Sequence, residues 1–227
     1  MSNLYWQRAD GTGPAVRLTT SPIAQLPDTI DPLGRVLIVH EGDPATGRQS
    51  LTTLALERDA SGAVKAGATV PLIGGPFLKA NARISPDGKW FAYAANETGI
   101  WEIYVQPFPG LGERVQVSNA GGNLAVWSTS KGELYYVGAG PTRMNAVAYS
   151  VNGTVFVPTK SRPWAQTTFM ASPPLSTYGP GFDIHPDGRR FVVAPLPEAA
   201  ADSPARSAQL IVVTNFLDEL RRLAPIR

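Results

Sequence analysis

The sequence predicts an all-β fold, a β-propeller of about four to five four-stranded blades. Two observations predict it. Short runs of strand-forming apolar and aromatic residues alternate with turns rich in Gly, Pro, Asn and Asp along the chain. A turn glycine also recurs at intervals of roughly 44 to 56 residues, a spacing typical of propeller blades. These turn glycines are Gly34, Gly88, Gly132 and Gly188.

The clearest repeat runs from Ile84 to Pro109. Its first turn is Ser85–Gly88, in which Pro presets φ, Asp caps the local backbone and Gly takes the left-handed position. The run Lys89–Ala94 is rich in aromatic residues that favour strands. After a second turn at Asn96–Gly99, the run Ile100–Val105 alternates apolar with polar or amphipathic side chains, as half-buried strands do. The segment therefore predicts a β-meander.

Variants of this meander divide the chain, which we expect to form a single domain over residues 1–227. We predict a half-blade at 1–22, blades at 23–76, 77–120, 121–170 and 171–214, and a short C-terminal helix within 215–227. The helix is expected over Phe216–Leu223, with Asn215 as its cap and Pro225 after its end. The strand before the turn of each blade should be the innermost one. These strands are Gln25–Ile30, Lys79–Ile84, Asn123–Ser128 and Gly181–His185.

Composition bounds the class of protein. The chain has 227 residues, of which 43% are hydrophobic and 17% charged, as in an ordinary globular domain. A net charge of +2 without a marked Lys/Arg cluster argues against nucleic-acid binding. The absence of cysteine excludes disulfides and thiolate chemistry. Neither a signal peptide nor an apolar run of the ~20 residues that span a membrane is visible, so we expect a soluble, cytoplasmic protein without membrane insertion.

With these turns and strands in place, the sequence resembles the TolB-type, WD40-like (PD40) β-propeller repeats. More closely, it resembles the propeller in the C-terminal half of many bacterial eukaryotic-like serine/threonine protein kinases. The resemblance rests on Ile84–Lys89, Tyr93–Gly99, Glu102–Pro109, Trp127–Ser128 and Leu210–Pro225, and covers nearly the whole chain. It implies the sensor part of a kinase-like parent, whose propeller could lie in the periplasm or outside the cell. The kinase motifs themselves, a Gly-rich phosphate loop, His-Arg-Asp and Asp-Phe-Gly, are absent.

The predicted chain begins in the middle of a blade, which leaves ring closure open. Either the half-blade at residues 3–20 closes the ring within the chain, or open blade edges pair between chains. Because unpaired strand edges favour association, we expect a homo-oligomer formed through these edges.

The innermost strands of a propeller line a central channel, and ligands bind at its mouth. The candidate ligand-binding residues there are Asp28, Asn81, Arg83, Asn123, Asp183 and His185, with Tyr178 in the preceding loop. Asp28 and Asp183, together with the two asparagines, offer oxygen ligands suited to Ca²⁺ or another divalent cation. Alternatively, these side chains bond one another and channel water, and His185 caps its turn.

Two functions follow from these residues. The first is a non-catalytic scaffold that binds a small molecule or a protein. The alternative is a promiscuous, metal-assisted hydrolase of activated esters or phosphotriesters, with its site in the channel or at a subunit interface. A Ser-His-Asp triad has little support, because His40 and His185 are the only histidines and the chain has no Gly-x-Ser-x-Gly elbow.

Overall fold

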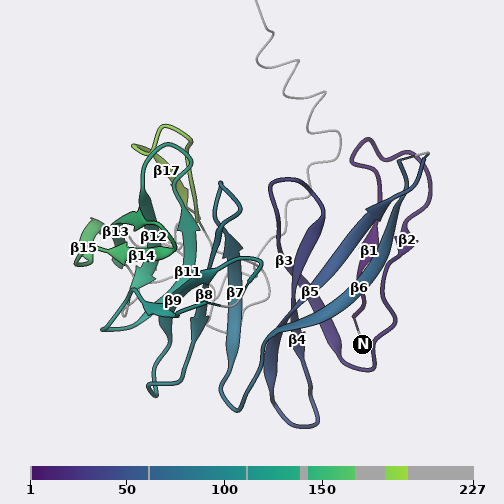
Figure 1. The fold of residues 1–227 in the computed structure, drawn as a ribbon, viewed down its shortest axis with the longest axis horizontal. Coiled ribbons are helices and arrows are strands. Elements are labelled where there is room, and N and C mark those ends of the chain that lie inside the picture. The colour runs from purple at the N-terminus through teal and green to yellow at the C-terminus, as the bar shows by residue number, and fades with distance from the viewer. Residues whose placement is uncertain (1, 61, 111, 139–142, 167–181, 194–227) are drawn as a thin grey trace, which may run out of the picture. The chain divides into compact units, whose positions relative to one another are not determined.

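The structure is a computed structural model that describes residues 2–60, 62–110, 112–138, 143–166 and 182–193. These residues belong to one compact unit that spans Met1–Leu196. Within them every regular element is a β-strand, which confirms the predicted all-β class (Figure 1). None of the described residues forms a helix that is long and apolar enough to cross a membrane.

The described strands form successive antiparallel meanders, as expected of propeller blades. The half-blade pairs β1 (Tyr5–Trp6) with β2 (Val16–Arg17). The first full blade has the strand order β3 (Ala24–Ile30), β4 (Val36–Gly42), β5 (Gln49–Arg58) and β6 (Val64–Ile73). The second has the order β7 (Lys79–Ile84), β8 (Trp90–Ala95), β9 (Glu102–Pro107) and β10 (Val115–Gln116). In each full blade the strand that comes first in sequence is the innermost.

The third full blade departs from the predicted four strands. Its meander is β11 (Gly122–Trp127), β12 (Glu133–Gly138), β13 (Arg143–Asn152) and β14 (Val155–Pro158). A fifth strand, β15 (Arg162–Gln166), also pairs with β13. The reason is the length of β13: its C-terminal half pairs with β14, which leaves the edge of its N-terminal half for β15.

Two strands of the last predicted blade are described. They are β16 (Phe182–Ile184) and β17 (Phe191–Val193), which form an antiparallel pair. The C-terminal part of this predicted blade, up to residue 214, and the predicted helix at 216–223 lie outside the described residues.

Neighbouring blades pack through the two faces of their strands. In β8, Phe91 and Tyr93 point to one apolar cluster, together with Ile38 and Leu51 of the preceding blade. The alternate residues of β8 join the opposite cluster, which includes Trp127 of the following blade. These alternate residues are Trp90, Ala92 and Ala94. All six residues of β8 are buried, because both of its faces are covered by other blades.

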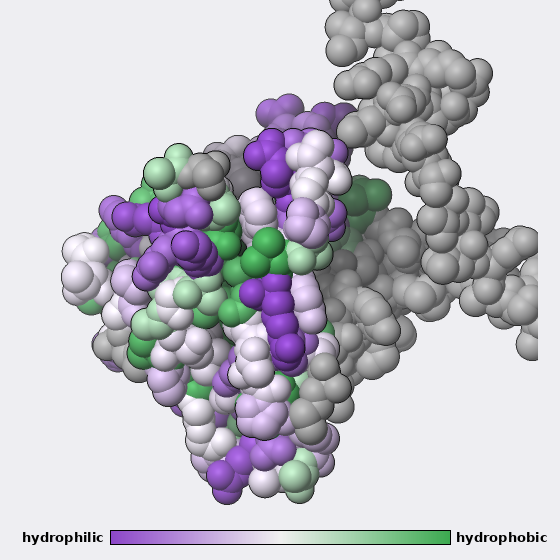
Figure 2. Space-filling view, turned by 90° about the vertical axis from the view of Figure 1, so that its right-hand side faces the viewer, coloured by the Kyte–Doolittle hydropathy of each residue, from purple (hydrophilic) through white to green (hydrophobic). Residues whose placement is uncertain are grey.

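The half-blade packs on the first full blade. Leu4, which is 5% exposed, joins Val39 and Leu54 in one apolar cluster. The backbone N–H of Leu4 donates to Thr19 Oγ1 at 3.0 Å, which ties the two ends of the half-blade together. Figure 2 shows the side of the protein on which β1, β2 and β6 lie in Figure 1. Polar and apolar side chains are interspersed over the coloured part of this surface, with one small apolar area near the middle.

The turns after the inner strands share one hydrogen-bonding frame. In each, the N–H of the first residue donates to the carbonyl five residues later; the first residues are Asp31, Ser85, Ser128 and His185. The fourth residue is Gly34, Gly88 or Gly188, each with positive φ, as the turn pattern predicts. Lys131 occupies this position in the remaining turn. Gly132 is therefore not the equivalent glycine, and the regular spacing read from it was wrong by one residue.

Candidate ligand-binding cleft

Each of the first three inner strands carries a β-bulge, one extra residue relative to the strand beside it. In β3 the extra residue is Asp28, between the paired residues Pro27 and Thr29. In β7 and β11 the bulges contain Asn81 and Leu124, whose φ angles are 58° and 54°. A bulge redirects side chains and is common next to binding sites. The three bulges therefore decide where the polar residues of the inner strands point.

Asn81 and Asn123 form a pair between two blades. The Nδ2 of Asn81 donates to Asn123 Oδ1 at 2.9 Å, and the same oxygen accepts the backbone N–H of Leu124 at 2.8 Å. Both asparagines are buried. Asn123 Nδ2 is buried without a hydrogen-bond partner among the described residues. For this pair the structure shows side chains that bond one another.

Asp28 and Arg83 join the first full blade to the second. Asp28 Oδ2 accepts the backbone N–H of Ala82 at 2.8 Å. Arg83 Nη1 donates to the backbone carbonyls of Asp28 and Ala82, at 2.7 and 2.9 Å. Burial raises the pKa of the Asp28 carboxyl, against the opposing effects of the Ala82 N–H and the charges of His40 and Arg83. The half-buried Asp28 thus bonds two successive residues of β7, one through its carboxylate and one through its backbone carbonyl.

A cleft of about 720 Å³ opens at the ends of β3, β7 and β11 and beside β16. All four inner strands, and the turns that follow β3, β7 and β11, contribute to its walls. The residues that line it are Ile30, Asp31, Pro32, Arg83, Ile84, Ser85, Pro86, Val126, Trp127, Thr129, Phe182 and Asp183. Its volume lies in the range of roughly 300–1,000 Å³ that is typical of ligand pockets, and most of its walls are apolar, as in such pockets.

Arg83 and Asp183 are oppositely charged and line this cleft. Each side chain uses only one of its polar atoms in hydrogen bonds to described residues. Only Nη1 of Arg83 donates to described residues, which leaves Nε and Nη2 without a partner there. Asp183 is exposed, and its Oδ1 accepts the backbone N–H of Ile184 at 2.8 Å. Burial lowers the pKa of Arg83, against the attraction of Asp28 and then of Asp183, but an arginine stays protonated under ordinary conditions.

Most other polar groups in the cleft hold turns. The Oδ1 of Asp31 accepts the backbone N–H groups of Arg35 and Val36 at 2.5 and 2.6 Å. Ser85 Oγ bonds Asp87 at 2.5 Å and accepts the N–H of Trp90 at 3.0 Å. These side chains already form hydrogen bonds in the folded protein. Arg83 and Asp183 are therefore the charged cleft residues with polar atoms left to bind a ligand.

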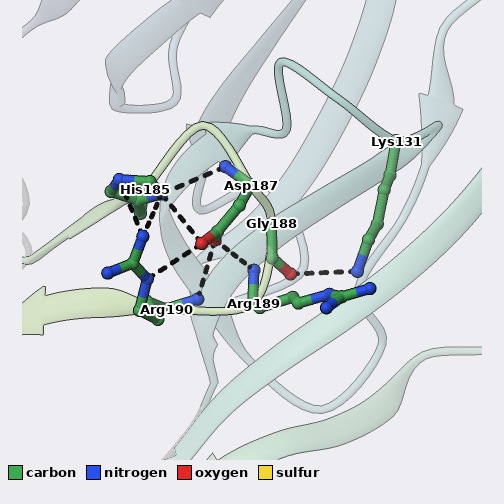
Figure 3. Close-up of polar contacts among 6 residues, drawn as sticks. All are labelled: Lys131, His185, Asp187, Gly188, Arg189 and Arg190. Atoms are coloured by element: carbon green, nitrogen blue, oxygen red, sulfur yellow. Dashed lines mark hydrogen bonds and ion pairs between the residues drawn. The ribbon is translucent and has the colours of Figure 1, made fainter.

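The turn at His185 follows β16 and is held by its own polar contacts (Figure 3). His185 Nδ1 accepts the backbone N–H of Asp187 at 3.2 Å, which confirms that His185 caps its turn. Arg190 reaches back over the turn and pairs with Asp187 Oδ2 at 2.8 Å, beside the imidazole ring. Lys131 Nζ, from the preceding blade, donates to the carbonyl of Gly188 at 3.0 Å. The last described turn is therefore bonded to its neighbour.

The predicted site residues thus separate into two groups. Asn81, Asn123 and Asp28 make contacts between inner strands, whereas Arg83 and Asp183 line the cleft. Tyr178 lies outside the described residues. In the described part of the chain, no three His, Cys, Asp or Glu side chains gather in a group that could hold a metal ion. A divalent-cation site built on the two channel aspartates and the asparagines stays a prediction.

Most cleft residues, Trp127 and Phe182 among them, were not among the predicted site residues. Trp127 Nε1 donates to the carbonyl of Arg83 at 2.8 Å, so its ring is both a wall of the cleft and a support for the arginine. Phe182 is 4% exposed and packs with Met144 and Leu124. Their position at the ends of inner strands was the available signal, but their apolar character indicated packing between blades instead.

Comparisons with known proteins found neither a matching family model nor a matching curated protein. Among solved structures, a protein assigned as TolB from Agrobacterium tumefaciens is 15% identical, with a TM-score of 0.49 over 73% of this chain and 59% of that one. TolB from Acinetobacter baumannii is 16% identical, with a TM-score of 0.46 over 83% and 47% of the two chains. A protein assigned as 6-phosphogluconolactonase from Bacteroides fragilis is 13% identical, with a TM-score of 0.38 over 83% and 68%. The chain spans about half of the length of the two TolB proteins.

Proposed function

We propose that this chain is a non-catalytic binding module that holds a segment of a partner protein in the cleft. The observation that carries the proposal is the cleft itself, to which all four inner strands contribute and whose lining combines apolar side chains with the charged residues Asp31, Arg83 and Asp183. Apolar walls with a few oriented polar groups are the usual composition of a binding site. A folded scaffold of this kind is expected to change little on binding.

The occupancy of the polar side chains supports binding over catalysis. The Asp31 carboxylate accepts three backbone N–H groups of its own turn, those of Leu33, Arg35 and Val36. Ser85 is likewise engaged in its turn. A nucleophile needs a base within hydrogen-bond reach, and a general base needs free access to the substrate. The cleft therefore offers recognition more readily than proton transfer.

The resemblance to the propellers of bacterial serine/threonine kinases supports a finer version of this proposal. In this finer version, the cleft binds the ligand that a longer parent chain senses. Open blade edges would add association between copies, because unpaired strand edges favour pairing.

The proposal can be tested with a selection of random peptides displayed on phage against the whole protein. Thr129 lines the cleft and is exposed, so Thr129→Trp should fill the cleft without disturbing the core. Thr98 is an exposed residue of the turn between β8 and β9 and is not part of the cleft lining, so Thr98→Trp is the matched control.

We expect selected peptides to bind the wild type and the control variant alike and to lose at least ~tenfold in affinity for the cleft variant, as blocking a site requires. Peptides that bind all three proteins equally would place binding elsewhere and refute the cleft as the site. A selection that enriches no binding peptide would refute the proposal that this chain binds peptides.

A further inference from the structure

The guanidinium of Arg83 is oriented by carbonyls from two blades, and the backbone of the same residue is held by a third blade. Its Nη1 donates to two carbonyls, one from Asp28 on the preceding blade and one from its own strand. The backbone of Arg83 is held in turn by the Trp127 indole N–H of the following blade. Each of these contacts removes freedom that binding would otherwise have to remove. The arginine is thus oriented before any ligand arrives.

The opposite edge of the same guanidinium is free. Among the described residues, no acceptor bonds Nε or Nη2 of Arg83, although the side chain is only half-buried and lines the cleft. Two parallel N–H groups on one edge of a planar guanidinium match the two oxygens of a carboxylate or phosphate. The free edge therefore points to an anionic, two-oxygen group on the ligand.

Asp183 decides between these two anions. It lines the same cleft, and its negative charge acts on Arg83. A phosphate dianion would be repelled more strongly by this carboxylate than a singly charged carboxylate would. Asp183 also offers an acceptor for an N–H or ammonium group, which a peptide carries close to its carboxylates. Apolar walls that include Ile84 and Phe182 fit the apolar side chains of such a peptide.

We infer that the ligand presents a peptide carboxylate to the free edge of Arg83, with Asp183 disfavouring phosphate in the same place. This inference rests on the proposed peptide-binding function of the cleft. The carboxylate can belong to the C-terminus of the ligand or to an internal Asp or Glu, and both present the same two oxygens.

Three sets of fluorescein-labelled hexapeptides with otherwise uncharged random positions distinguish these sources by fluorescence anisotropy. One set ends in a free carboxylate, one ends in an amide, and one ends in an amide but carries one internal Asp. We expect the amide set without Asp to bind at least ~tenfold more weakly than one or both carboxylate sets, as loss of a charged hydrogen bond implies. Binding by the first set assigns the C-terminus, and binding by the third assigns an acidic side chain.

Two substitutions test the roles of the charged residues. Arg83→Lys keeps the charge but loses the two-pronged edge, so carboxylate peptides should bind at least ~tenfold more weakly while amide peptides keep their affinity. Asp183→Asn, at an exposed position, should make phenyl phosphate a stronger competitor by about threefold or more. Circular dichroism checks the fold of both variants, and the Asp183 variant keeps the test decisive if the Arg83 variant does not fold.

The outcomes distinguish the carboxylate inference from the proposed peptide-binding function on which it rests. The carboxylate inference would be overturned if amide and carboxylate peptides bound with equal affinity and Thr129→Trp weakened the binding of both. The cleft would then remain a peptide site. Competition by phenyl phosphate that Asp183→Asn leaves unchanged would also overturn it. Binding that Thr129→Trp leaves intact, or no binding by any set, would overturn the proposed function itself.

Discussion

Replacing Trp127 by Phe should destabilise the protein more than replacing Trp90 by Phe. Both indoles are almost fully buried, at 6% and 5% exposure, and both belong to the same apolar cluster and pack against Phe156. They differ in their N–H groups. Trp127 Nε1 donates to the Arg83 carbonyl, whereas Trp90 Nε1 is buried without a hydrogen-bond partner among the described residues.

The magnitude follows from this difference, because the loss of ring volume is similar in both variants. Trp127→Phe removes a hydrogen bond with a net contribution of about 0.5–1.5 kcal/mol. Trp90→Phe removes an unpaired buried donor, which recovers about 1–3 kcal/mol of desolvation cost. We therefore expect the free energy of unfolding to be roughly 3 kcal/mol lower for the Trp127 variant than for the Trp90 variant. For a chain of this size the difference corresponds to a Tm lower by about 6–12 °C.

Urea unfolding followed by far-UV circular dichroism measures both variants without relying on tryptophan fluorescence. Two-state behaviour with equal m-values is the condition for comparing the midpoints. Peptide affinity should also fall in the Trp127 variant, because this ring lines the cleft and supports Arg83. Equal stability of the two variants, or a larger loss on replacing Trp90, would refute the reasoning.

Four further predictions concern the turns, pH, metal ions and assembly. Gly88→Ala and Gly99→Ala should each cost about 1–2 kcal/mol, because both glycines have left-handed φ angles of 70° and 89°. Gly88→Ala should cost more in thermal unfolding, because its Cβ would lie 3.3 Å from Pro32 whereas that of Gly99 meets nothing within 4 Å; equal costs would contradict a tight contact between turns. Burial lowers the pKa of His40 below its ordinary 6.5, so the unfolded chain binds the proton more readily and stability is lost as pH falls below that value. Relative to wild type, His40→Gln should therefore gain stability between pH 7 and pH 5, and a constant difference in urea unfolding would disprove this. If the chain is a metal-assisted hydrolase, EDTA should abolish turnover of activated esters and phosphotriesters and Ca²⁺ should restore it, whereas a binding module shows no turnover in either condition. Light scattering should give a mass above that of one 24.2 kDa chain if open edges pair, and a mass of one chain would disprove the predicted homo-oligomer.

The strands and turns could be predicted because their signals are local. Ser85–Gly88 combines residues that each favour one position of a turn, and the structure has Gly88 at φ 70°. The same signal failed at Gly132, because a glycine next to the turn cannot be distinguished by composition from the glycine inside it. The strand β15 was missed for another reason. Its pairing with β13 depends on the length of a distant strand, and Pro163 weakens its own strand pattern.

The candidate site could be predicted only in part. Topology placed Asn81, Arg83 and Asp183 on inner strands, but an alternating pattern cannot tell where a side chain points after a bulge. An asparagine such as Asn81 tolerates positive φ and so hints at the bulge in β7, whereas Leu124 carries no such hint. The cleft also depends on contacts across three blades, such as that of Trp127 with Arg83. Contacts of this kind have no counterpart in local sequence.

The covered faces of β8 have a consequence for how this protein can change. Phe91 and Tyr93 pack against one neighbouring blade, while Trp90 and Ala92 pack against the other. The two faces of this blade are therefore not interchangeable. A blade copied or exchanged during evolution would meet a foreign surface on both sides at once. Insertion of one residue into β8 would also swap the two sets of side chains between the neighbours. Blades of this chain should therefore tolerate new loops far more readily than a new order.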